Sequence, residues 1–74
     1  METVESTLWR ASTKLLEIER LKNDMDTNGA RIMELMDSLL SQDIIQALGT
    51  APHIRMWMRK VCSELADHYT SQLA

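Results

Sequence analysis

Apolar residues recur at intervals of three and four positions through the first half of the chain. The series comprises Val4, Leu8, Ala11, Leu15, Ile18, Met25, Ile32, Met36 and Leu39. These intervals place the side chains on one face of an α-helix. Lys22 and Gly29 occupy two places in the series without being apolar packing residues, and the phase is the same on both sides of them. We therefore expect one long helix over residues 6–40, which continues through Asn28 and Gly29.

The segment Gly49-Thr50-Ala51-Pro52 is the clearest break in this pattern. Gly commonly ends a helix and Pro commonly starts one, so we expect a short helix over residues 42–48 and a medium helix over residues 52–72. The apolar stripe of the last helix comprises Ile54, Trp57, Met58, Val61, Leu65, Tyr69 and Leu73. No alternation of apolar and polar residues is long enough to predict a strand. The predicted fold class is therefore all-α, a single three-helix domain over residues 1–74.

The length and composition of the chain limit how it can be stabilised. Its 74 residues form one domain at most, and 45% hydrophobic with 26% charged residues is typical of soluble globular proteins. A core of this size rarely supplies more than about 3–5 kcal/mol. One Cys and two His exclude a disulfide framework and are too few for a closed four-ligand zinc site. Oligomerisation or binding to a larger protein is the remaining common source of stability.

Charge and the first residues bear on localisation and on nucleic acids. The net charge is −3 at pH 7, so we expect no surface that tracks phosphates, although Arg55, Arg59 and Lys60 lie near Trp57. The start, METVEST, is acidic and polar, unlike a secretory signal, and no apolar run approaches the ~18 residues of a membrane span. Together with the lone thiol of Cys62, these features predict a cytoplasmic protein without a membrane segment or direct nucleic-acid binding.

One short motif has the spacing of metal ligands. Residues 24–29 read D-x-D-x-N-G, the opening of a calcium-binding helix–loop–helix. That loop also needs a bidentate Glu at its twelfth position, where Leu35 stands, while Glu34 is one place early. A solvated polar turn of the long helix explains the pattern better, and we expect neither a metal nor a cofactor.

Catalytic constellations are missing from the sequence. Cys62 is nine residues from His53 and six from His68, so neither imidazole shares its face of a helix as residues three or four apart would. There is no Gly-rich phosphate loop, no Ser-His-Asp set and no nucleophile elbow. The sequence therefore predicts a protein that is not an enzyme.

Two blocks of residues together resemble a known family. The first block consists of Glu19-Arg20-Leu21, Asp24-Met25, Gly29, Ile32 and Glu34, and the second is His53-Ile54-Arg55-Met56-Trp57-Met58-Arg59. In order and separation they are similar to the theta subunit of bacterial DNA polymerase III, including its phage-encoded homologue. That family has an acidic–basic–aliphatic triplet, an Asp-aliphatic pair and a Gly in its first helix. Its last helix carries a His-aliphatic-Arg-x-aromatic-hydrophobic-Arg run.

The resemblance implies a three-helix accessory subunit without catalysis. Such a subunit binds and stabilises the proofreading exonuclease subunit, epsilon, within the polymerase core during DNA replication. For this protein–protein interaction we expect contacts from the first and last helices. The predicted contact residues are Leu21, Met25, Ile32, Met33, His53, Met56 and Trp57.

A second interpretation is a self-associating protein. The apolar stripe from Val4 to Leu39 favours a helical hairpin or coiled-coil homodimer, acting as an adaptor such as a phage inhibitor or a co-chaperone. Lys22 and Gly29 within the stripe count against a regular zipper.

Overall fold

Four α-helices follow one another in the computed structural model, which describes residues 3–73. They are α1 (Val4–Leu21), α2 (Gly29–Leu39), α3 (Gln42–Leu48) and α4 (Pro52–Leu73), and a short 3₁₀ segment, η1 (Lys22–Asp24), follows α1. The described residues contain no strand. The all-α prediction is therefore confirmed, as are the short helix over residues 42–48 and the start of the last helix at Pro52.

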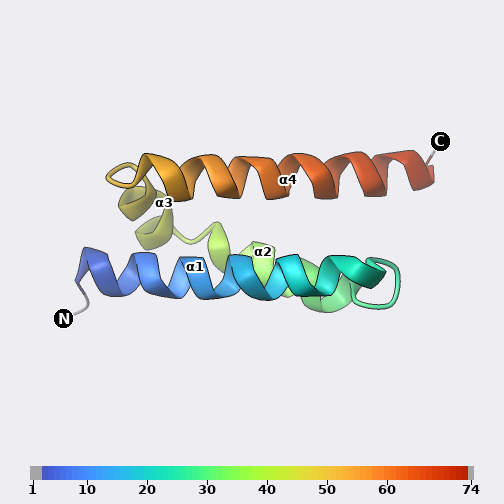
Figure 1. Ribbon diagram of the computed structural model, residues 1–74, viewed down its shortest axis with the longest axis horizontal. Coiled ribbons are helices and arrows are strands. Elements are labelled where there is room, and N and C mark those ends of the chain that lie inside the picture. Colours follow the sequence, from blue (N-terminus) through green and yellow to red (C-terminus); the bar gives the residue numbers. More distant parts are fainter. Residues whose placement is uncertain (1–2, 74) are drawn as a thin grey trace.

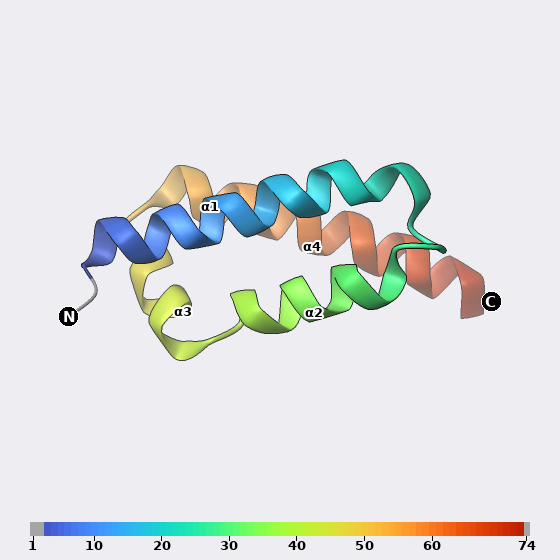
Figure 2. The same cartoon turned by 90° about the horizontal axis from the view of Figure 1, so that it is seen from below.

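The helices α1, α2 and α4 lie along the long axis of an elongated molecule measuring 42 × 18 × 18 Å. Figures 1 and 2 show α1 and α4 running in the same direction, with α2 returning antiparallel to both. The short helix α3 lies at the end where α4 begins, and the turn between α1 and α2 lies at the opposite end. This arrangement is an α1–α2 hairpin covered by one long helix.

The single long helix predicted over residues 6–40 is wrong. The chain leaves α1 after Leu21 and reverses through residues 22–28 before α2 begins at Gly29. Two polar side chains satisfy backbone groups within this turn. Asn28 Nδ2 donates to the carbonyl of Leu21 at 3.1 Å, and the backbone N–H of Thr27 donates to Asp24 Oδ1 at 3.2 Å. Asp and Asn form turns readily because their short side chains make such local bonds.

The start of α1 also differs from the expected boundary. Thr3 is the N-cap, and its Oγ1 accepts a hydrogen bond of 3.1 Å from the backbone N–H of Ser6. The hydroxyl thereby satisfies one of the free donors of the first turn. The helix consequently begins two residues earlier than predicted.

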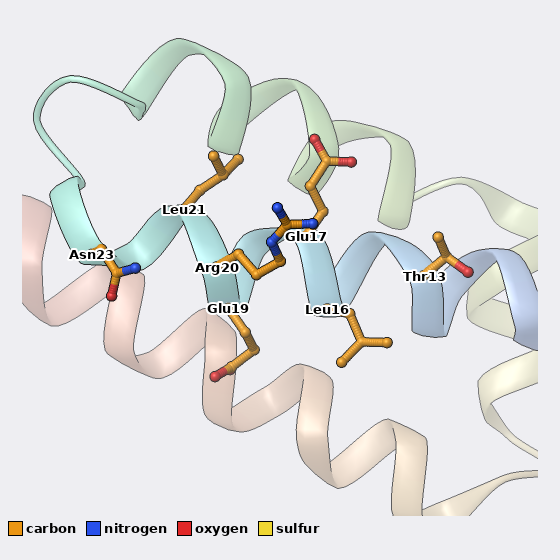
Figure 3. Close-up of a pocket in the computed structure, with 7 residues that line it drawn as sticks. All are labelled: Thr13, Leu16, Glu17, Glu19, Arg20, Leu21 and Asn23. Carbon is orange, nitrogen blue, oxygen red and sulfur yellow. The ribbon is translucent and has the colours of Figure 1, made fainter.

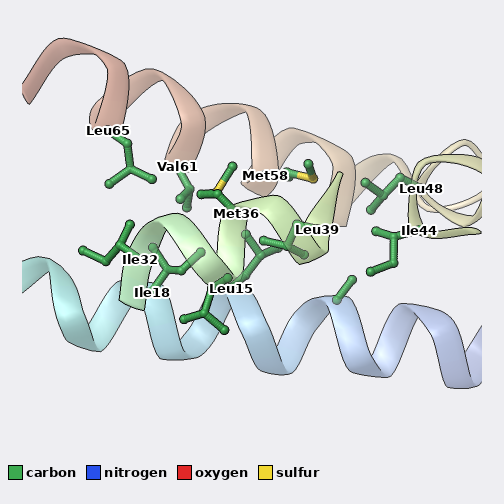
Figure 4. Close-up of a cluster of buried hydrophobic side chains, with 12 residues drawn as sticks. Leu15, Ile18, Ile32, Met36, Leu39, Ile44, Leu48, Met58, Val61 and Leu65 are labelled. Atoms are coloured by element: carbon green, nitrogen blue, oxygen red, sulfur yellow. The ribbon is translucent and has the colours of Figure 1, made fainter. Parts of the chain in front are cut away.

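The core is formed by buried side chains from all four helices (Figure 4). It comprises Ala11, Leu15 and Ile18 from α1, Ile32, Leu35, Met36 and Leu39 from α2, Ile44 and Leu48 from α3, and Met58, Val61 and Leu65 from α4. The two halves of the N-terminal stripe therefore cover each other within one chain. None of the buried side-chain nitrogen and oxygen atoms of the described residues lacks a hydrogen-bond partner.

Two adjacent leucines test this core. Leu15 is fully buried whereas Leu16 is 57% exposed. We expect Leu15→Ala to lower the free energy of unfolding by about 2–5 kcal/mol, because it removes apolar contacts and leaves a cavity. The matched Leu16→Ala should change it by less than about 0.5 kcal/mol. Urea unfolding followed by circular dichroism measures both, and equal losses would contradict this packing.

The hairpin can be tested separately by distance. Thr13 and Arg31 line the same depression although they are 18 positions apart. In a continuous helix their Cα atoms would be about 27 Å apart, whereas packed neighbouring helices have axes about 8–10 Å apart. Spin labels at Thr13→Cys and Arg31→Cys, in a Cys62→Ser background, should give a short electron–electron distance. It should be comparable to that of a Thr13/Arg20 control pair within α1, and a value near three times the control would disprove the reversal.

Candidate protein-binding surface

Two apolar depressions lie along α4, one lined with residues of α3 and the other with residues of α2 and its C-cap Leu40. Figure 2 shows the arrangement of these three helices. One part, about 460 Å³ in volume, is lined by Ile45, Leu48, Arg55, Met58, Arg59 and Cys62. The second part, about 340 Å³, has walls that include Met33, Leu40, Cys62, Ala66, Tyr69 and Leu73. Cys62 lines both parts, so they are adjacent, and we call the two together the α4 trough.

The local sequence explains why apolar side chains remain in this trough. Leu39 and Ile44 are buried, and their neighbours Leu40 and Ile45 are exposed by 55% and 47%. Successive helical residues are about 100° apart around the axis, so adjacent side chains point in different directions, and in each of these two pairs one member lies outside the core. Met33, 58% exposed, stands beside the fully buried Ile32 in the same way. Exposed large apolar side chains that gather on one surface mark an interaction site more often than scattered ones do.

Two arginines give one end of the α4 trough a positive charge. Arg55 and Arg59 line its α3–α4 part, and neither makes an ion pair within residues 3–73. They lie in the first two turns of α4, where no acidic residue stands in the first turn. The positive end of the helix dipole disfavours cations there. The trough therefore carries two guanidinium groups whose charge the rest of the described chain does not neutralise.

Polar contacts hold the far end of the trough in place. Tyr69, which lines it, donates a hydrogen bond of 3.2 Å from its hydroxyl to the carbonyl of Met25 in the 22–28 turn. Lys22 forms ion pairs with Glu64 of α4 and, at 3.2 Å, with Glu19 of α1. Lys22, a polar residue within the apolar series of residues 4–39, thus links α1 to α4.

Asp26 is a further link between the turn and α4. Its Oδ1 lies 3.2 Å from His68 Nε2 and accepts a hydrogen bond from Gln72 Nε2. The bonds from Gln72 and His68 hold the pKa of the Asp26 carboxyl below its ordinary value. Within the calcium-like motif of residues 24–29, Asp24 Oδ1 and Asp26 Oδ1 thus accept hydrogen bonds from the protein itself, and Asn28 donates one through Nδ2. No group of three or more His, Cys, Asp or Glu within the described residues could hold a metal ion.

The thiol and the imidazoles lie apart. Cys62 is half-buried in the trough, and this burial raises the pKa of its thiol, which favours the unreactive protonated form. His53 is exposed at the start of α4, and His68 faces Asp26 near its end. The geometry therefore places neither imidazole as a base for the thiol.

The predicted contact residues do not form one surface. Met33 lies on the trough, but Ile32 is fully buried in the core, so we remove it from the contact set. Leu21 and Met25 are half-buried at the turn end of the molecule. The remaining three lie in the first turns of α4, at the opposite end: His53 and Met56 are exposed, and Trp57 is half-buried against the core.

Sequence reasoning missed most of the trough. Leu40, Ile45, Arg55, Arg59 and Cys62 were not among the expected contacts. The pairs Leu39-Leu40 and Ile44-Ile45 held only a partial signal, because adjacent helical side chains point in different directions but can both be buried, as Leu35 and Met36 are.

A larger depression lies on the outer side of α1 (Figure 3). Its lining residues, which include Leu16, Glu19, Arg20 and Asn23, all belong to α1 and η1. A surface built from one helix has no opposing wall, and four of its seven lining side chains (Glu17, Glu19, Arg20 and Asn23) are charged or amide-bearing. The α4 trough, with walls from three helices and an apolar floor, is the better candidate for binding.

The ion pairs of the 22–28 turn predict how stability depends on pH. The hydrogen bond with Lys22 lowers the pKa of Glu64 from its ordinary 4.5, and the same bond raises the pKa of Lys22 above 10.5. A lowered carboxyl pKa contributes stability that is lost as the pH falls through the folded value, and a raised lysine pKa contributes stability that is lost as the pH rises. The urea midpoint should therefore be level at neutral pH and fall below about 4.5 and above about 10.5.

The variant Glu64→Gln provides the control for this profile. It removes the carboxylate while keeping the size of the side chain, so both falls should become shallower. An unchanged pH profile in this variant would show that the Lys22–Glu64 pair does not contribute to stability.

None of the four helices in the described part of the chain has the length and apolar character that crossing a bilayer requires. No protein-family model, curated protein or solved structure matches this chain. The case for a binding surface therefore rests on the residues themselves and on their arrangement.

Proposed function

We propose that this chain is a non-catalytic accessory protein that binds another polypeptide through the α4 trough. Three exposed apolar side chains, Met33, Leu40 and Ile45, carry the proposal, because they face a surface beside a core that is complete without them. Covering a large apolar side chain completely contributes about 1.5–3 kcal/mol. These side chains are about half covered already, so a partner would gain roughly 2–4 kcal/mol from the three before the cost of association.

Binding would act on the stability of both proteins. A ligand that binds only the folded form stabilises it by mass action. A 74-residue chain with a small core gains from this effect as its partner does. This mutual stabilisation of the two proteins is consistent with a role as a stabilising accessory subunit.

The proofreading exonuclease subunit of a replicative polymerase is the partner that we propose. Support comes from the second block of the theta-like resemblance, because residues 53–59 form the first two turns of α4 and include Arg55 and Arg59 of the trough. The first block is divided between two helices, since Glu19 belongs to α1 and Ile32 to α2. The resemblance is therefore concentrated at the α3–α4 end of the molecule.

Self-association through the N-terminal stripe has less support. Leu15, Ile18, Ile32 and Leu39, which would form a coiled-coil seam, are fully buried within one chain. A homodimer would have to use another surface, of which the trough is the most apolar.

A binding experiment with a matched pair of variants tests the function. Leu40→Lys places a charge in the trough, and Leu16→Lys places the same charge at a leucine of similar exposure on α1, outside the trough. With the purified exonuclease subunit, the wild-type chain and Leu16→Lys should bind at micromolar concentrations. Leu40→Lys should bind at least tenfold more weakly, because a lysine ammonium would be desolvated in the interface.

Isothermal titration calorimetry measures these affinities, and circular dichroism verifies that both variants remain folded. Absence of a wild-type complex at micromolar concentrations would eliminate the exonuclease as the partner. Equal weakening by both lysines would remove the trough as the binding surface.

A further inference from the structure

We propose that the α4 trough takes an amphipathic α-helix of another protein, and that this helix carries carboxylate side chains at the end that faces Arg55 and Arg59. The inference rests on the proposed function, since it assumes that the trough binds a polypeptide. It adds the secondary structure, length and charge of the segment that binds.

The shape of the trough fits a helix. Its α4 wall extends from Arg55 to Leu73, which at 1.5 Å per residue is about 27 Å. A helix of about 18 residues has the same length. An open apolar groove of this length, bounded by helices, is the form of surface that takes an amphipathic helix, anchored by apolar residues at positions i, i+3, i+4 and i+7.

The floor and walls of the trough are apolar along most of this length. Met33 and Met58 contribute flexible thioethers, which adapt to differently shaped apolar partners. The far end, with Tyr69, Thr70 and Leu73, carries no charged side chain. A bound helix therefore needs one apolar face along its length and gains nothing from a charge at the Leu73 end.

Charge distinguishes the two ends. Arg55 and Arg59 are four residues apart, so they lie on the same face of α4. They are the only charged residues among those that line the trough in the described chain. Carboxylates on the bound helix would form charge-assisted hydrogen bonds with both guanidinium groups, and this one-sided pairing would fix the direction in which the helix lies.

A second copy of this chain is a poorer occupant. The trough has two arginines and no carboxylate in its lining, so two troughs placed face to face, parallel or antiparallel, would offer the guanidinium groups no acidic partner from that surface. The net charge of −3 opposes an acidic partner at long range, but salt screens exposed charges beyond about 8 Å at physiological ionic strength. The local pair of arginines therefore dominates at contact.

Three designed peptides test the proposal on the full chain. Each is an 18-residue fluorescein-labelled helix with Leu at the i, i+3, i+4 and i+7 positions of one face. The first has two Glu residues in one terminal turn, the second has Gln at these places and the third has Lys. We expect fluorescence anisotropy to show micromolar binding of the Glu peptide, about tenfold weaker binding of the Gln peptide and still weaker binding of the Lys peptide.

Charge-reversal variants test whether the arginines of the trough determine the preference for the Glu peptide. Arg59→Glu should reverse the preference, so that the Lys peptide binds more tightly than the Glu peptide. Arg20→Glu makes the same change of charge on α1, outside the trough, and should keep the wild-type order. Leu40→Lys should weaken all three peptides, and circular dichroism verifies the fold of each variant.

Five outcomes would overturn the proposal. The first four are equal binding of the three peptides, equal effects of Arg59→Glu and Arg20→Glu, no binding of any peptide at 100 μM or less, and a dimer in sedimentation equilibrium whose dissociation is required before the Glu peptide binds. A single-stranded oligonucleotide that competes with the Glu peptide in an Arg59-dependent way would also overturn it. Each of these outcomes is compatible with binding to the exonuclease subunit, so failure of this inference is distinguishable from failure of the proposed function.

Discussion

The reversal of the chain at residues 22–28 is the constraint on which the rest of the structure depends. A continuous helix over residues 6–40 would be about 52 Å long, longer than the 42 Å of the whole molecule. Its apolar stripe would need a cover of equal length, and the remaining helices are too short to provide one. By folding back, α2 covers the stripe of α1, and Leu15 and Ile18 become fully buried together with Ile32.

The polar contacts at the turn determine geometry more than stability. Ion pairs at the protein surface contribute about 0–1 kcal/mol each, and the part-buried Lys22–Glu64 pair is one interaction beside the burial of twelve apolar side chains in one core. However, the Tyr69 hydroxyl and Glu64 connect α4 to the turn at specific places along its length. They therefore determine how far α4 extends beside α2, and with it the length of the trough between them.

The sequence was sufficient to predict the helical class, the short third helix and the start of α4, because Gly49 and Pro52 have strong local preferences. It was insufficient to predict the reversal for a simple geometric reason. The turn occupies seven residues, 22–28, and seven residues also make about two turns of helix, so the apolar stripe resumes in phase. Asp24 and Asn28 are turn-forming residues, and Lys22 and Gly29 interrupt the apolar series, but the phase of the series is the same on both sides of the turn.

The candidate surface was harder to predict because it depends on which helices meet. Adjacent apolar residues can both be buried, as Leu35 and Met36 are, so the sequence alone does not show that Leu40 and Ile45 are exposed. These two side chains line one trough only because α2 and α3 both lie beside α4. Arg55 and Arg59 likewise belong to a solvated face of an isolated helix, and the wall formed by α3 makes them the rim of an apolar trough. Two identical troughs would offer these guanidinium groups no compensating carboxylate, whichever way they paired. The charge at this rim therefore favours occupants other than a second copy of the same surface.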